Sequence, residues 1–301
     1  MVQTLAKEQY FYAFSKKNKV GLRVPSGSQV VVETFDCFQN QIQSAETGFN
    51  AIDWNQINPA TGSIFVEGAK PGDILKVKID KIELGDMGVL ATGPGLGVMG
   101  HRIDEFEVKM VPIVDGKAVF NERIQLPLNP MIGVIGVAPE GDPVSCGTPG
   151  AHGGNMDTTL ITSGATLYFP VFQEGALFGL GDMHAAMGDG EIGVSGVEIP
   201  GKVSVTLEVI KGKSIPFPFL ENKEGVAVIV SKATLDEAAK AAVEIFVDTL
   251  LPHTDLTLPE LTMLFSAAGQ VQVSQIVDPL LTARFFVPKS ILEAYDVKLF
   301  D

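Results

Sequence analysis

The sequence predicts a mainly β body, of the β-sandwich or barrel-like type, followed by a C-terminal α+β segment. The first two thirds of the chain hold short runs of Val, Ile and Leu between turn residues, and the 301 residues include 32 Gly and 18 Pro. Clear helical periodicity begins only in the last third. Apolar residues, at 46%, supply a large core. We therefore expect a β-rich body over 1–212 that carries the functional site, and an α+β domain over 213–301.

The β body is expected to begin with a Val-rich strand at Gln29–Phe35. In Asp73–Leu84 apolar and polar residues alternate, which is the period of a strand with one buried face. Val108–Val114 and Lys117–Ile124 flank Asp115-Gly116, a pair that accepts the positive φ of a hairpin turn. Further strands are expected at Pro130–Pro139, Ala165–Phe172 and Glu191–Ile210.

The C-terminal segment is expected to follow a linker at Lys211–Lys223 and to open with a strand at Gly225–Ser231. Thr234 and Glu237 have the spacing of a capping box before an apolar helical stripe that runs to Leu250. A second helix is expected to begin after Thr257, with Glu260 completing its capping box, and to stop at Gly269 in the left-handed conformation. Two strands, Gln270–Asp278 and Leu280–Pro288, and a short helix, Ser290–Tyr295, complete the prediction.

Composition excludes several classes of protein. The chain carries 22 Lys and Arg against 36 Asp and Glu, a net charge of -14, so we expect no nucleic-acid partner. No uncharged apolar run reaches the length of a membrane span, and the N-terminal residues lack the apolar core of a signal peptide. The two cysteines, Cys37 and Cys146, are too few for a disulfide scaffold. We expect a cytoplasmic protein with reduced thiols and no membrane partner.

Residues capable of chemistry crowd into the segment between Cys146 and Glu198. Asp182 and His184 are two apart, so on an extended strand they face the same way and can reach one cation at roughly 2.0–2.2 Å each. The apolar run before Asp182 places this carboxylate at the end of a buried strand. A buried carboxylate is costly unless it is paired or bound to a metal. The alternative is a turn Asp beside a surface His.

Two further groups in this segment are candidates. Asp189 and Glu191 lie in a Gly-Asp-Gly-Glu loop, where Glu191 is either a general acid and base or part of a solvated acidic turn. Asp157 follows a Gly-Gly-Asn turn and either completes a metal shell or forms an Asx-turn.

The residues of that turn, Gly153, Gly154 and Asn155, are candidates for binding a substrate carbonyl. Asp36, at the end of the Val-rich strand, is a candidate fourth metal ligand. Cys146 lacks a local basic neighbour, so an idle buried thiol is favoured over a nucleophile.

Taken together, several segments resemble the acetamidase/formamidase family of metal-associated amide hydrolases. Their order and spacing run through the first two thirds of the chain, and the C-terminal third matches more loosely. The matching segments are Asn58–Gly62, Val66–Ala69, Pro71–Asp73, Pro130–Pro139 (PMIGVIGVAP), His152–Asp157 (HGGNMD) and Gly175–Glu191 (GALFGLGDMHAAMGDGE).

The resemblance implies a β-rich body with an α+β tail, a homo-oligomer, and hydrolysis of small acetamide-like amides to carboxylate and ammonia. Combined with the residue patterns, it assigns a divalent cation to Asp157, Asp182 and His184, with Asp36 as a further ligand. Mixed His and carboxylate ligands suit zinc or another first-row ion, whereas an Asp-dominated shell suits calcium or magnesium. Glu191 would move the water proton, with Asp182 and His184 also in the catalytic set.

Two other functions remain open at this stage. The acidic and Gly-rich loops also fit a non-catalytic module that binds a metal ion or a small ligand. A metal hydrolase of a different amide or an ester would share the same centre. An open coordination position that faces a small closed pocket favours the amidase.

Overall fold

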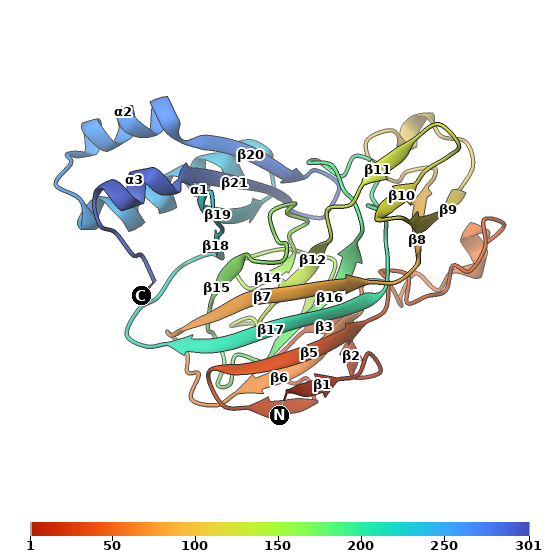
Figure 1. Cartoon of the computed structure of the whole chain (residues 1–301), viewed down its shortest axis with the longest axis horizontal. Helices are drawn as coiled ribbons and strands as arrows, with labels where there is room; N and C mark the ends of the chain where they lie inside the picture. The colour runs from red at the N-terminus through yellow and green to blue at the C-terminus, as the bar shows by residue number, and fades with distance from the viewer. Residues whose placement is uncertain (1, 301) are drawn as a thin grey trace.

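In the computed structural model, which describes residues 2–300, two large β-sheets face each other around one core (Figure 1). Buried side chains from both sheets, among them Val30, Val77 and Val205 from one and Ile64 and Ile132 from the other, fall in a single apolar cluster. The sheets therefore form a sandwich. Neither sheet, over the described residues, closes into a barrel.

The larger sheet has nine strands in the order β1-β5-β17-β7-β15-β18-β19-β21-β20, and all of its pairs but β1–β5 are antiparallel. Its strands are β1 (Gln3–Leu5), β5 (Ser28–Thr34), β17 (Gly201–Ile210), β7 (Ile74–Leu84), β15 (Thr166–Pro170), β18 (Phe219–Glu221), β19 (Gly225–Lys232), β21 (Leu281–Pro288) and β20 (Gln270–Gln275).

The second sheet has six strands in the order β14-β12-β16-β6-β2, with β4 also paired to β6. Its strands are β14 (Gly153–Asn155), β12 (Met131–Gly136), β16 (Phe178–His184), β6 (Ala60–Val66), β2 (Tyr10–Phe11) and β4 (Leu22–Val24). Two small sheets complete the body: β11 (Gln125–Pro127), β10 (Lys117–Val119), β9 (Glu107–Val114) and β8 (Met87–Thr92) in one, and β13 (Val144–Ser145) with β3 (Ala13–Phe14) in the other.

At two places the structure confirms what the local sequence pattern predicted. In β7 the apolar residues at alternate positions are buried while Lys78 is exposed. Asp115 and Gly116 have φ of 49° and 71°, and they join β9 to β10 as an antiparallel hairpin with Val114 opposite Lys117.

The C-terminal residues form α1 (Leu235–Leu250), α2 (Leu258–Ala268) and α3 (Lys289–Ala294), and α1 packs against β19 and β21. Thr257 and Glu260 form the expected capping box, and Thr234 accepts the backbone N–H of Glu237. The prediction for Gly269 was wrong: its φ of -74° and ψ of 151° are extended, because the chain passes directly from α2 into β20.

A second apolar core lies under these helices and includes Phe219, Phe246, Phe265 and Phe285. The strands of this segment nevertheless extend the nine-stranded sheet of the body.

Five predicted strands were too long. Four of them shorten to β12, β10, β15 and β20: Pro130–Pro139, Lys117–Ile124, Ala165–Phe172 and Gln270–Asp278. Only the second half of Glu191–Ile210 is a strand, and before it Glu198 makes only isolated antiparallel bridges, to Val89 and to His184. Short 3-10 turns occur at Phe49–Ala51, Gly100–Arg102 and Leu251–His253. None of the helices formed by residues 2–300 has the length and apolarity needed to cross a bilayer.

Candidate functional site

Four carboxylates surround one imidazole in a buried cluster. Asp182 and His184 lie on β16, Asp157 follows β14, and Glu191 and Glu198 lie in the irregular segment before β17. Each of the five is at most 7% exposed. The structure thus brings together four residues chosen from the sequence and adds Glu198.

Potential ligand atoms in this cluster form two neighbouring groups. Those of Asp157, His184 and Glu191 all lie within 4.8 Å of one another. Those of Cys37, Asp182 and Glu198 form a second such group. His184 connects the two, because its Nε2 lies 3.1 Å from Oε1 of Glu198 and 3.4 Å from Oδ1 of Asp182.

The electrostatics of the cluster are dominated by burial. Burial opposes protonation of His184, but the carboxylates of Glu198 and Asp182 outweigh it and raise the pKa of the imidazole well above its ordinary value. Burial raises the pKa of Glu191 to about 8 and raises the pKa of Asp157 and of Glu198 well above the usual range. Neighbouring carboxylates push these values in the same direction.

Several polar atoms of the cluster are buried without a hydrogen-bond partner in the part of the chain described. They are Oδ1 and Oδ2 of Asp157, Oδ1 of Asp182, Oε2 of Glu198, and both ring nitrogens of His184. Buried carboxylates without partners are strongly unfavourable unless a cation compensates their charge. The donor set, carboxylate oxygens with an imidazole and a nearby thiol, therefore fits a divalent cation.

The backbone at the cluster is unusual. Asp157, Asp182 and Glu191 have φ of 38°, 53° and 46°, in the left-handed region that non-glycine residues rarely adopt. Asp182 interrupts the ladder with β12, where the register passes from Ile132–Met183 to Val134–Gly181. Such conformations persist only where the surrounding structure enforces them, and they concentrate at functional sites.

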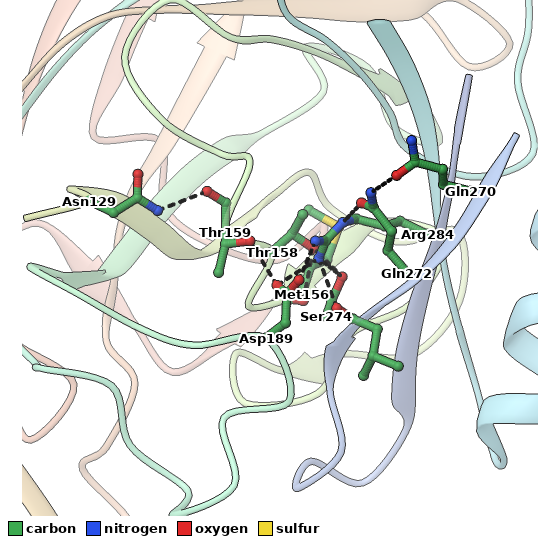
Figure 2. A network of polar contacts seen from close by, with 10 residues as sticks. Asn129, Met156, Thr158, Thr159, Asp189, Gln270, Gln272, Ser274 and Arg284 are labelled. Carbon is green, nitrogen blue, oxygen red and sulfur yellow. Dashed lines mark hydrogen bonds and ion pairs between the residues drawn. The ribbon is translucent and has the colours of Figure 1, made fainter. Parts of the chain in front are cut away.

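A polar network around Arg284 includes residues close to Asp157 and Glu191 in the sequence, namely Thr158 and Asp189 (Figure 2). Arg284 of β21 donates two hydrogen bonds to the carboxylate of Asp189, two residues before Glu191, at 3.1 and 2.7 Å. Arg284 also donates to Ser274 Oγ, which accepts from Thr158 Oγ1 at 2.9 Å, one residue after Asp157. Asp189 is therefore a support of the loop rather than a member of the cluster.

The remaining candidates chosen from the sequence lie around this centre. Asn155 donates from Nδ2 to Asp278 at 3.0 Å, and its Oδ1 has no partner among the described residues. Gly153 and Gly154 have φ of 95° and 83° and pair with β12, and the N–H of Gly153 donates to Gly150.

Asp36 is buried but belongs to neither ligand group. Its Oδ1 accepts the N–H of Asn40 at 2.7 Å, and burial raises its pKa to about 6. Cys146 is also buried, and burial raises the pKa of its thiol, which is the environment of an unreactive cysteine.

Sequence reasoning missed Glu198 and Asp278. Glu198 lies between the apolar residues Val197 and Ile199. A single acidic residue between two apolar ones could have indicated a buried carboxylate at this position. Asp278 comes from the turn between β20 and β21, and no local pattern connects it with a site on β16. Burial raises its pKa well above the usual range, and the carboxylates of Asp157 and Asp182 add to the effect.

A cavity of about 340 Å³ opens onto the cluster. Its polar wall includes Asn155, Asp182, Glu191, Glu198 and Asp278. The cluster is therefore accessible to a small molecule while its carboxylates stay largely shielded from solvent.

The chain matches the model of the acetamidase/formamidase family over residues 17–144 and 144–294. A predicted acetamidase/formamidase from Thermoanaerobacter tengcongensis is 55% identical, with a TM-score of 0.97 and 99% of each chain covered. An acetamidase from Bacillus halodurans is 44% identical with a TM-score of 0.96, covering 98% of this chain and all of that one.

A formamidase from Methylophilus methylotrophus is 27% identical over 252 residues. That match covers 62% of this chain and spans only 61% of the formamidase. Because the family model covers most of its length, the chain belongs to the acetamidase/formamidase family.

Proposed function

We propose that this protein hydrolyses small aliphatic amides to a carboxylate and ammonia with the help of a bound divalent cation. The observation that carries the proposal is the set of buried carboxylate and imidazole atoms without hydrogen-bond partners among the described residues, beside a cavity that Asp182, Glu191 and Glu198 line. Family membership supports the reaction class.

We assign the cation to Asp157, Asp182 and His184, which come from the two neighbouring ligand groups. Glu191 completes the group of Asp157 and His184, and Glu198 and Cys37 complete the group of Asp182. When bound, such a cation polarises a carbonyl and lowers the pKa of a coordinated water towards about 7. The imidazole and the nearby thiol favour zinc or another first-row ion over calcium. Asp36, which faces Asn40, is better placed to shape the turn that carries Cys37 than to act as a ligand.

Glu191 is the residue we assign to proton transfer. Its carboxylate lies 3.8 Å from His184 Nε2 and borders the cavity. In the unprotonated form it accepts a proton from the attacking water, and it returns that proton to the departing nitrogen. Asn155 would orient the substrate carbonyl, while Gly153 and Gly154 let its backbone lie close against β12.

The test is ammonia release from short amides by protein that has been stripped of metal and then resupplied with single divalent ions. We expect release to depend on the ion. Glu191→Gln should lower kcat by about 10²- to 10⁴-fold without changing the fold. Glu224→Gln, a change at an exposed glutamate, is the matched control. Full activity of Glu191→Gln would remove this residue from the mechanism.

We further propose that the protein acts in the cytoplasm as a homo-oligomer. Its two cysteines are buried and unpaired, which suits a reducing compartment. An apolar groove lined by Phe120, Ile124, Leu126 and Ile192 is a surface that a second copy could cover. Light scattering on the wild type and on Ile192→Glu tests the assembly, and a monomeric wild type would exclude it.

A further inference from the structure

The lining of the cavity at the cluster combines two kinds of side chain. The carboxylates and Asn155 contribute polar atoms, and Asn58, Ser145 and Thr148 also belong to the lining. Much of the rest is apolar: Phe38, Trp54, Ile57, Leu96 and Val194. A molecule whose amide group meets the carboxylates therefore has apolar side chains in the same cavity for its remaining atoms.

The first apolar wall is part of a packed cluster. Phe38 is buried in it, and Trp54 and Ile57 pack against it. The ring of Trp54 lies 4.7 Å from that of Phe49, and its Nε1 donates to the carbonyl oxygen of Phe49. The only polar atom of this indole is thus already used, which leaves apolar surface for a ligand.

The second apolar wall comes from two loops that support each other. Leu96 and Val194 belong to loops joined by a hydrogen bond from the N–H of Val98 to the carbonyl oxygen of Ile192 at 2.8 Å. The loops that carry Leu96 and Val194 are therefore held together beside the cavity.

The size of the cavity indicates what it holds. At about 340 Å³ the cavity is many times larger than the share of about 30 Å³ that one water takes in the liquid, and acetamide has only four heavy atoms. The cavity therefore leaves room beside the amide group for more carbon atoms than acetamide supplies.

We infer that the substrates of this site are neutral amides with an apolar acyl chain of several carbons, such as butyramide, rather than formamide or acetamide. This inference rests on the proposed function. An acyl chain that carries its own charge would have to give up its hydration against the apolar side chains of the cavity, which offer that charge no partner. Succinamate should therefore bind more weakly than butyramide.

A binding measurement tests the inference without relying on turnover. Trp54 is the only tryptophan of the chain and lines the cavity, so its fluorescence reports occupancy. Each buried methylene should tighten binding about fourfold, which makes the Kd of butyramide about 16-fold lower than that of acetamide. Equal Kd values, or tighter binding of acetamide, would overturn the inference.

A turnover measurement separates this inference from the proposed function. The ratio of kcat/KM for butyramide to that for acetamide should exceed about 10 and should fall several-fold in Ile57→Ala. Met263→Ala, which truncates an exposed apolar residue on α2, should keep the ratio. Fastest hydrolysis of formamide would overturn the inference and leave amide hydrolysis standing. Butyramide that binds more tightly than acetamide without any ammonia release would overturn the proposed function and leave the apolar-ligand inference standing.

Discussion

Adding one methyl group at Gly133 should disable the buried cluster of carboxylates around His184. Gly133 lies on β12 opposite the irregular point of β16. A Cβ at this position would lie 2.3 Å from Oδ1 of Asp157 and 2.5 Å from Oδ2 of Asp182. Ordinary contact begins at 3.4 Å, so in Gly133→Ala the nearer carboxylate must recede by about 1 Å. The φ of Gly133 lies outside the left-handed region, so the effect is steric rather than conformational.

A displacement of about 1 Å in a catalytic group costs about 10²-fold in rate, or ~2.7 kcal/mol of transition-state stabilisation. We expect kcat/KM of Gly133→Ala to fall by that factor, with weaker metal binding in competition against a chromophoric chelator. Overpacking should also cost about 1–3 kcal/mol of stability. Gly141→Ala is the control, because its Cβ would meet nothing within 4 Å. Activity of Gly133→Ala within threefold of the wild type would refute this reasoning.

Three other outcomes are expected. Removing the proposed cation with a chelator should lower Tm by roughly 8 °C. A ligand present at about 1,000 times its Kd adds about 4.1 kcal/mol to the free energy of unfolding, and removing it takes that stabilisation away. An unchanged Tm would contradict a bound ion. Burial lowers the pKa of His152 to about 4, whereas the pKa of this histidine in the unfolded chain is about 6.5. The free energy of unfolding therefore keeps its full value above about pH 6.5 and decreases by up to about 3 kcal/mol as the pH falls towards about 4. Urea unfolding of the wild type and His152→Phe between pH 7 and 4 should show this difference, and parallel curves would rule it out. Arg284→Leu should lower the free energy of unfolding by about 3 kcal/mol, because the arginine side of its ion pair with Asp189 is buried. Lys223→Leu, which removes one partner of an exposed ion pair, should change it very little. Equal denaturation midpoints of the two variants would count against this prediction.

The sequence predicted correctly those strands, turns and helix caps that depend on residues close together in the chain. The alternation in β7, the turn at Asp115 and the cap at Thr257 each depend on residues close in sequence, and each is confirmed. The expectation that Asp182 and His184 face the same way also rests on a local period, and their side chains lie 3.4 Å apart.

The rest of the site depends on contacts between distant segments. Asp278 reaches Asn155 across more than a hundred residues, and neither has a neighbour in sequence that indicates the other. Glu198 lies in a predicted strand of which only the second half forms, and isolated bridges to Val89 and His184 hold it beside the cluster. Propensity and periodicity describe a segment by itself and therefore contain no information on such pairs.

The polar network around Arg284 has a consequence for synthesis of the protein. The segments that carry Asp157 and Glu191 leave the ribosome well before β20 and β21, which supply Ser274 and Arg284. At about 5–20 residues per second, the nascent chain carries an unbraced and strongly acidic centre for several seconds. The centre is thus braced only late in synthesis, and a ribosome-bound chain truncated before residue 270 should bind the proposed divalent cation more weakly than the finished protein does.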